Sequence, residues 1–303
     1  MRVGIKAGPA NWQKILPQVE PECCEIWFRI DWKKRYIPLF KYLNKRKIPF
    51  GLHFWAMIDN KYFPDMLCLK KGLGEKTFQL IKETIDIASI WQAEYVNFHP
   101  ESYHLNLLDL DKHQIKTLNP DEPIDKEKSF QQLLFYLKKI KKYSEKKGVT
   151  PFLETVPKYM PSDFKNLDKG RRKVAKSEGL ETEKFFELAE LNYPVCLDLG
   201  HTIGQLISND KEQLFSYLYT TTKKLKPVIG LIHVTTNKAP FNGTDSHNGV
   251  LEKDFNQGVV PDKKQLIKLL SLFKDKDVCL IPEPRIEDMV ENHRVLKEIV
   301  KKI

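Results

Sequence analysis

The segment GTDSHNG at residues 243–249 places a carboxylate and an imidazole two positions apart, between glycines. In an extended segment, residues i and i+2 point to the same side, so Asp245 and His247 would be directed at one point. The segment is too polar to belong to a hydrophobic core. A carboxylate and an imidazole that meet at one point can together bind a divalent cation such as Zn²⁺.

Other histidines and acids stand at the ends of short apolar runs elsewhere in the chain. With Asp245 and His247 they make nine candidate ligands from six runs: His53, His99, Glu154, Asp198, His201, His233, Asp245, His247 and Glu283. The chain has only eight histidines, and five of them belong to this set. A single histidine at a strand end is more often a hydrogen-bonded rim residue than a ligand, so the prediction depends on the whole set.

The mixture of charges in this set predicts a metal site. Carboxylates are rarely buried unless they are paired or metal-bound, and four of them with five imidazoles would suffer like-charge repulsion at one rim. Bound divalent cations remove that repulsion. Imidazole and carboxylate ligands suit Zn²⁺, with Mn²⁺ or Fe²⁺ as alternatives. Nine ligands would serve three ions with three ligands each, or two ions with ligands to spare.

Eight apolar runs, separated by segments of helical period, must position these residues. The runs cover residues 2–8, 23–28, 48–55, 95–100, 150–156, 194–201, 228–236 and 278–284. Most are continuous rather than alternating, as in parallel strands covered by helices. We predict an α/β fold, a single (β/α)8 TIM barrel domain over residues 1–303, with an open doubly wound sheet as the alternative. Long loops at 101–125 and 157–179 follow the fourth and fifth strands, on the face where barrel active sites form.

The composition narrows the class of protein. The chain has 303 residues, with 50 Lys and Arg against 40 Asp and Glu, and a pI near 9.1, which favours an anionic partner such as nucleic acid or a phosphorylated substrate. The five cysteines are odd in number and include no CxxC pair, and Cys196 and Cys279 lie inside apolar runs as expected for small core residues, which predicts a reducing compartment. With no signal peptide and no apolar stretch long enough to span a membrane, we expect a cytoplasmic protein. Nothing in the sequence requires more than a monomer.

Several motifs resemble one known family. They are NFHPESY at 97–103, LET at 153–155, DLGH at 198–201, HVTTNKAPFNGTDSH at 233–247 and EP at 283–284. Together they resemble the endonuclease IV type of apurinic/apyrimidinic endonuclease, within the xylose-isomerase-like TIM barrel superfamily. The resemblance implies three Zn²⁺ ions. His53, His99 and Glu154 would hold the first; Glu154, Asp198, His233 and Glu283 the second; His201, Asp245 and His247 the third.

The same resemblance implies an activity and a partner. The reaction would be hydrolysis of the DNA backbone at abasic or damaged sites by a metal-activated hydroxide, with Glu154 and Glu283 as the catalytic residues. Candidate DNA contacts are Arg29, Lys33, Trp55, Tyr62, Arg171 and Arg172. The chain departs from the family where Glu101 replaces the glycine after His-Pro, and the DNA-bending loops of the family have no clear counterpart.

Two other functions fit the same barrel. A sugar isomerase or epimerase of this superfamily needs one metal ion, held by the positions of Glu154, Asp198, His233 and Glu283, with carboxylates that move a proton next to a carbonyl. That chemistry does not need His53, His99, Asp245 and His247 together, so their presence discriminates between the two functions. A barrel that binds metal or nucleic acid without turnover is the other alternative.

Overall fold

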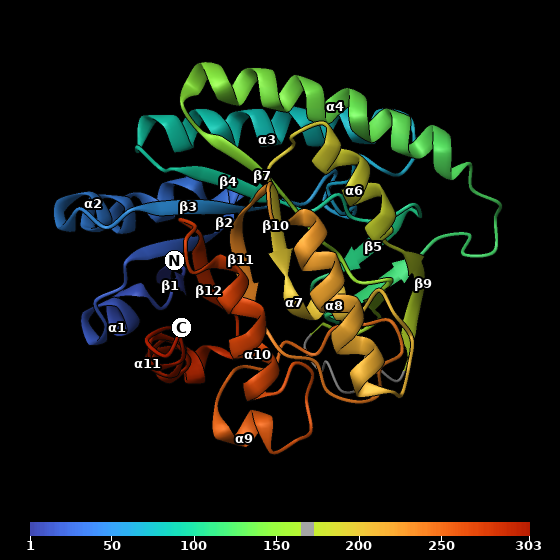
Figure 1. Ribbon diagram of the computed structural model, residues 1–303. Coiled ribbons are helices and arrows are strands. Elements are labelled where there is room, and N and C mark those ends of the chain that lie inside the picture. The colour runs from blue at the N-terminus through green and yellow to red at the C-terminus, as the bar shows by residue number, and fades with distance from the viewer. Residues whose placement is uncertain (165–172) are drawn as a thin grey trace.

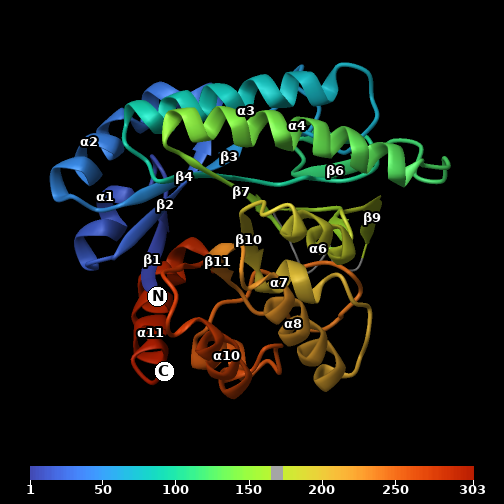
Figure 2. The same ribbon diagram turned by 45° about the horizontal axis from the view of Figure 1, so that its top comes forward.

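Eight parallel strands close into a barrel in the computed structural model, which describes residues 1–164 and 173–303 (Figures 1 and 2). Around the barrel the strands run β1-β2-β3-β4-β7-β10-β11-β12, and β12 pairs with β1 to close it. Their bounds are β1 Arg2–Ala7, β2 Cys23–Arg29, β3 Phe50–Trp55, β4 Tyr95–Phe98, β7 Thr150–Glu154, β10 Val195–Asp198, β11 Ile229–Val234 and β12 Cys279–Pro282. Each lies within a predicted run or extends it by one residue, which confirms the barrel and excludes the open sheet.

Helices cover the outside of the barrel between successive strands (Figure 1). They are α1 Trp12–Ile15, α2 Ile37–Arg46, α3 Leu73–Ile90, α4 Lys126–Lys147, α6 Thr182–Glu190, α7 Leu199–Ile203, α8 Lys211–Leu225, α9 Glu252–Phe255, α10 Lys263–Leu270 and α11 Met289–Val300. Short 3-10 segments cover Leu16–Gln18, Ile30–Tyr36, Ser271–Phe273 and Ile286–Asp288. Within the described ranges, no helix is both long enough and apolar enough to cross a membrane.

The sequence of α4 shows why these helices form and which face they bury. The side chain of Asp125 caps the first turn by accepting a hydrogen bond from the Lys128 N–H, and Gly148 ends the helix in the left-handed region at φ 68°. Phe130, Leu133 and Leu137 recur at helical spacing and are buried. Figures 1 and 2 show α4 lying alongside α3 on the outside of the barrel.

The two long connections carry small sheets of their own. The first contains β5 (Asn106–Asp109) and β6 (Gln114–Thr117), and the second contains β8 (Tyr159–Pro161) and β9 (Val174–Glu178). The connections contact each other, because the Ile115 N–H donates to the carbonyl of Ser162 at 3.2 Å. Both follow the carboxyl ends of strands, so they extend the barrel on the face predicted from the sequence.

The inside of the barrel holds one apolar layer. Its members are Cys23, Tyr95, Phe152, Cys196, Leu231, Cys279 and Ile281. Gly51 on β3 and Gly4 on β1 lie at the level of this layer. A Cβ on Gly51 would come within 2.1 Å of the Tyr95 ring, and a Cβ on Gly4 would come within 2.6 Å of Cys23 Sγ. Since alternate residues of a strand point inward, the residue two positions further along each strand also points inward, nearer the carboxyl-end mouth.

The reducing compartment predicted from the cysteines is not supported, because two of the cysteines are paired. Cys23 and Cys279 form a disulfide across β1, where the missing side chain of Gly4 leaves room between the two flanking strands. Cys24, Cys68 and Cys196 are buried free thiols. The odd number of cysteines and their spacing gave no sign of a pair that joins strands 256 residues apart in the chain. The cysteine pattern therefore gives no support for a reducing compartment.

Candidate metal centre

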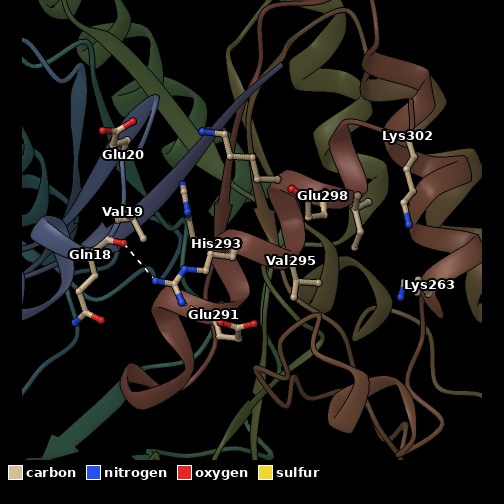
Figure 3. A pocket seen from close by; sticks show the side chains of 12 residues that line it. Gln18, Val19, Glu20, Lys263, Glu291, His293, Val295, Glu298 and Lys302 are labelled. Carbon is tan, nitrogen blue, oxygen red and sulfur yellow. Dashed lines mark hydrogen bonds and ion pairs between the residues drawn. The ribbon is translucent and has the colours of Figure 1, made fainter.

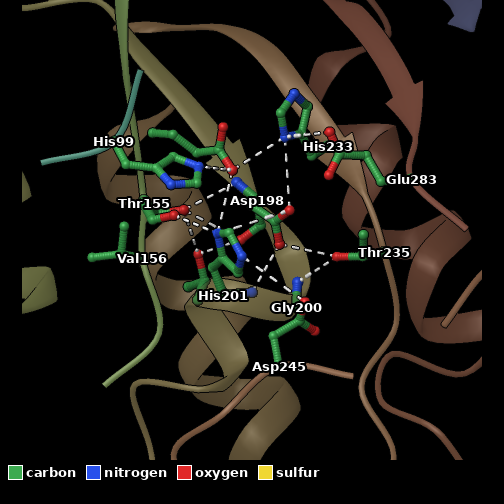
Figure 4. Close-up of polar contacts among 12 residues, drawn as sticks. His99, Thr155, Val156, Asp198, Gly200, His201, His233, Thr235, Asp245 and Glu283 are labelled. Atoms are coloured by element: carbon green, nitrogen blue, oxygen red, sulfur yellow. Dashed lines mark hydrogen bonds and ion pairs between the residues drawn. The ribbon is translucent and has the colours of Figure 1, made fainter. Parts of the chain in front are cut away.

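The candidate ligands gather at the carboxyl-end mouth of the barrel, as Figure 4 shows for most of them. Those on β3, β7, β10 and β11 stand two residues after an inward-facing member of the strand: His53 after Gly51, Glu154 after Phe152, Asp198 after Cys196, and His233 after Leu231. Glu283 follows the end of β12 in the same register. The strand period therefore places these side chains above the apolar layer.

Glu154 lies at the centre of the gathering. Its Oε1 is 3.1 Å from His99 Nε2, 3.3 Å from His201 Nδ1 and 3.2 Å from His233 Nδ1. Its Oε2 accepts a hydrogen bond from Asn97 Nδ2 at 2.5 Å, which fixes the carboxylate in that orientation. Glu154 is fully buried. A carboxylate with one oxygen in the middle of three imidazoles is well placed to bridge two cations.

The two carboxylate oxygens of Asp198 have different neighbours. Oδ1 accepts hydrogen bonds from the His201 N–H at 2.8 Å and the Thr235 hydroxyl at 3.0 Å, the first of which caps α7. Oδ2 points to the centre, 3.7 Å from His233 Nδ1. His233 Nδ1 also lies 3.2 Å from Glu283 Oε1. Three carboxylates therefore surround one nitrogen of His233, as the second predicted ion would require.

A third group lies beside the first two. His247 Nε2 is 3.1 Å from Asp245 Oδ2, and His201 Nε2 is 3.9 Å from the same oxygen. The Asp245 loop packs closely on α7, since a Cβ on Gly200 would come within 2.4 Å of Asp245 Oδ1. His201, Asp245 and His247 can thus present one ligand atom each to a common point, and so can His53, His99 and Glu154.

The residues present fit divalent cations. Among the residues that the structure describes, the buried atoms without a hydrogen-bond partner include His99 Nε2, Glu154 Oε1, Asp198 Oδ2 and His233 Nδ1. These are the atoms that face the centre of the site. Buried polar atoms normally have partners, so a convergent set of imidazole and carboxylate atoms without them is typical of a metal centre.

Charge within the site raises the pKa of several histidines in the metal-free protein. Burial alone would lower the pKa of His99, but the Glu154 carboxylate and a hydrogen bond with Glu101 outweigh it and raise the pKa to about 10. Burial also lowers the pKa of His201, but the Asp198 and Glu154 carboxylates outweigh it and raise the pKa to about 9. The pKa of His233 is also raised well above its usual value, against burial, by neighbours that include Glu154 and Glu25. His53 differs, because burial and the Lys6 ammonium lower its pKa to about 3.

These shifts give a pH dependence that can be measured. At pH 7.5 the raised pKa values leave His99 and His201 protonated in the metal-free protein, whereas a metal ligand must be neutral. Metal binding should therefore release about two protons per chain from these histidines, and affinity should rise with pH until about pH 9 to 10. Calorimetric titration with Zn²⁺ in buffers of different ionisation heat measures this release. A binding heat that is independent of the buffer would contradict it.

The sequence did not single out several residues that belong to this site. Lys6, Glu25 and Asn97 face inward on β1, β2 and β4, each two residues after an interior position. Lys6 and Glu25 are buried, at 6% and 0% exposure, and form an ion pair at 3.0 Å. Each is a charged residue inside an apolar run, two positions after a residue that faces the barrel interior. This pattern in the sequence could have identified them. The thiol of Cys196 also lies near Glu154 and His233, but burial raises its pKa, so it stays protonated and is a poor ligand.

The predicted DNA contacts are scattered over and beyond the mouth. Arg29 stacks on Trp32 and Trp55, 4.5 Å and 4.7 Å from the ring centres, and pairs with Asp31. Lys33 forms an exposed ion pair with Glu83 at 2.6 Å. The ammonium groups of Lys61 and Lys70 lie 4.9 Å and 5.2 Å from the ring centre of Tyr62. Arg171 and Arg172 fall outside the described residues.

Glu101, where the chain departs from the endonuclease IV pattern, adopts the backbone conformation that glycine favours. Its φ is 63°, in the left-handed region. Its Oε1 lies 3.5 Å from His99 Nδ1, the nitrogen that faces away from Glu154. The carboxylate thus gives His99 an outer partner, so the departure is compatible with His99 as a ligand.

A groove on the outside of the barrel is separate from this site. It runs between α11 and the segment before β2, and the side chains along it carry both charges, including Glu20, Lys263 and Glu298 (Figure 3). None of the nine candidate ligands, all of which the structure describes, lines it. The groove is therefore not part of the metal centre.

Comparison with known proteins identifies the family. The family model described as xylose isomerase-like TIM barrel matches residues 22–299. Similar solved structures include a D-tagatose 3-epimerase-like protein (15% identity, TM-score 0.67, covering 100% of this chain and 98% of that one). They also include a putative xylose isomerase from Rhodospirillum rubrum (16%, 0.66, 100% and 99%) and endonuclease IV from Thermus thermophilus (15%, 0.57, 100% and 100%).

At such low identity these structures show the fold alone. No curated protein is similar enough in sequence to count as a match. The family model, by contrast, covers most of the chain and agrees with the closed barrel. The chain belongs to the xylose isomerase-like TIM barrel family.

Proposed function

We propose that this protein is a metal-dependent phosphodiesterase that cleaves the DNA backbone at abasic or damaged sites, with three Zn²⁺ ions per chain. One observation carries the proposal: His201, Asp245 and His247 converge as a third ligand group beside the groups around Glu154 and His233. A sugar enzyme with a single ion has no use for this third group. Clusters of two or more cations are used to cleave phosphoesters.

Bound cations would polarise the phosphoryl oxygens and lower the pKa of a water molecule. The chain's own residues hold the geometry in which that can happen. Glu154 gathers His99, His201 and His233 around one oxygen, and Asn97 fixes the direction of its carboxylate. Glu283 holds the opposite side of the site next to His233 and Lys6.

Surface features at the mouth support a nucleic-acid partner. Trp27 is 62% exposed on β2, directly beside His53 on β3 in the sheet register. Arg29 lies against the neighbouring Trp55 and Trp32 rings. Exposed aromatic rings stack on unpaired bases, and guanidinium groups contact phosphates. With the net charge of +10, these residues favour an anionic polymer over a small neutral sugar.

A duplex that contains one abasic site tests this proposal. The zinc-loaded protein should cut the damaged strand next to the lesion, leave the undamaged duplex intact, and lose this activity when a chelator is added. End-group analysis of the product should show a 3′ hydroxyl, as expected for cleavage 5′ to the lesion. Intact damaged DNA, at protein concentrations at which the metal ions are shown to be bound, would overturn the proposal.

A sugar isomerase or epimerase is the second candidate. The specific observation in its favour is that Glu154, Asp198 and Glu283 surround His233 Nδ1 at 3.2 to 3.7 Å, which is sufficient for one ion. Glu154 and Glu283 would then move a proton on the carbon next to a carbonyl. Exchange of solvent deuterium into ketohexoses by the metal-loaded protein, without cleavage of abasic DNA, would select this candidate.

A further inference from the structure

Glu25 lies in contact with the outer nitrogens of two different candidate ligands. Its Oε1 is 3.3 Å from His53 Nδ1 and 2.9 Å from His233 Nε2. The other nitrogen of each ring faces the candidate ions: His53 Nε2 lies 3.6 Å from Glu154, and His233 Nδ1 is surrounded by carboxylates. Glu25 and His233 are both fully buried, so water does not compete for these contacts.

A histidine that binds a metal through one nitrogen carries its proton on the other, and that N–H commonly donates to a carboxylate, which fixes the ring and its tautomer. Glu25 occupies this place for His53 and His233 at the same time. In the assignment that the resemblance to endonuclease IV implies, His53 belongs to the first ion and His233 to the second. One buried carboxylate would therefore orient ligands of two ions.

Lys6 explains why Glu25 is an acceptor rather than a ligand. Its ammonium lies 3.0 Å from Glu25 Oε1 and also contacts Glu283. A dication bound directly to Glu25 would sit next to this ammonium and be repelled by it. The group of Glu25, His53, His233 and Glu283 could otherwise hold an ion of its own, and the ammonium of Lys6 already supplies a positive charge there.

The contact between Lys6 and His53 sets the tautomer of His53 in the metal-free protein. Lys6 Nζ lies 2.6 Å from His53 Nδ1. An ammonium that donates to Nδ1 requires the ring proton to be on Nε2, which blocks that nitrogen from a metal ion. With a metal ion held at Nε2, the ring proton of His53 would be on Nδ1, where it could be donated to Glu25, and the Lys6 ammonium would pair with Glu25 and Glu283.

We infer that Glu25 is a positioning residue shared by two metal ions, which holds His53 and His233 in the tautomers that bind metal and has Lys6 as its counter-ion. This inference rests on the metal cluster of the proposed function but not on its DNA substrate. Metal titrations without DNA therefore test it independently of the activity.

Replacing Glu25 with glutamine tests it, because the side chain keeps its shape and loses its charge. Affinity for the two ions nearest Glu154 should fall about 10- to 100-fold, as is usual when an outer partner of a metal ligand is lost. Affinity for the ion at Asp245 and His247 should stay unchanged. Titration against a competing chelator measures all three steps. The matched control is Glu22→Gln, since Glu22 accepts a hydrogen bond from the Val3 N–H near the opposite end of the barrel.

Two results would overturn the inference. Loss of a whole ion in Glu25→Gln would make Glu25 a direct ligand, and unchanged affinities would make it an ordinary buried ion-pair residue. If the variant does not fold, a measurement on the wild-type protein still tests the inference. Nitrogen-15 spectra of its zinc-loaded histidines should show the proton on Nδ1 of His53 and on Nε2 of His233, and the opposite tautomer at either ring would contradict the assignment.

Discussion

Replacing Asp245 with asparagine should remove one metal ion per chain and lower the rate of cleavage at an abasic site at least about 10³-fold. Asp245 Oδ1 accepts hydrogen bonds from the N–H groups of Ser246 and His247, and an amide oxygen can keep both. The charge on Oδ2, which faces His201 and His247, is lost. Removing a single neutral donor to a developing charge already costs about 10²- to 10³-fold, so loss of a cation should cost at least as much.

Elemental analysis and single-turnover cleavage measure the two effects on the same samples. The matched control is Asp254→Asn, since Asp254 is also a buried carboxylate, but it caps α9 by accepting from the Leu251 N–H. The control should keep all of its ions and its cleavage rate. Full cleavage by Asp245→Asn with one ion missing would show that the third group is not needed for the reaction, and would remove the observation on which the proposed function rests.

Replacing Glu154 with glutamine should have a still larger effect, with two ions lost and cleavage reduced by about 10⁴-fold or more. Glu154 Oε1 lies within 3.3 Å of a nitrogen of each of His99, His201 and His233, so the substitution removes a negative charge shared by all three imidazoles. A cation contributes several kcal/mol to a charged transition state, and each 1.4 kcal/mol or so is a factor of ten in rate. The ion at Asp245 and His247 should remain.

The control for this variant is Glu94→Gln, because Glu94 pairs with Arg2 at the other end of the barrel. Metal content by elemental analysis, and cleavage under the same conditions, compare the two variants. Thermal unfolding of the metal-free proteins separates folding from binding. A Glu154→Gln protein that keeps three ions would show that Glu154 does not bridge, whatever its effect on the rate.

The sequence predicted the barrel well because its main signals are local. Continuous apolar runs such as 229–234 and helical periods such as that of Phe130, Leu133 and Leu137 need no knowledge of distant contacts. The nine candidate ligands also follow from local position, since a polar residue at the end of a parallel strand reaches the mouth of a barrel wherever the strand lies in the order.

The features that the sequence did not reveal depend on the closure of the barrel. The pair of Lys6 and Glu25 and the disulfide of Cys23 and Cys279 each require neighbours that only the β12-β1-β2 arrangement brings together. The outer partners of the histidines are also hidden, because Glu101 and Glu25 are single acids in ordinary surroundings along the chain. The predicted DNA contacts have no such positional rule, and they stay predictions.

The central claim is that nine side chains at one barrel mouth hold three cations. Anomalous diffraction from zinc-loaded crystals measures this directly. Three peaks should appear, each about 2.0–2.2 Å from nitrogen or oxygen atoms of its own ligand group, with one peak between His201, Asp245 and His247. A single peak among Glu154, Asp198, His233 and Glu283, with the Asp245 loop empty, would contradict the claim.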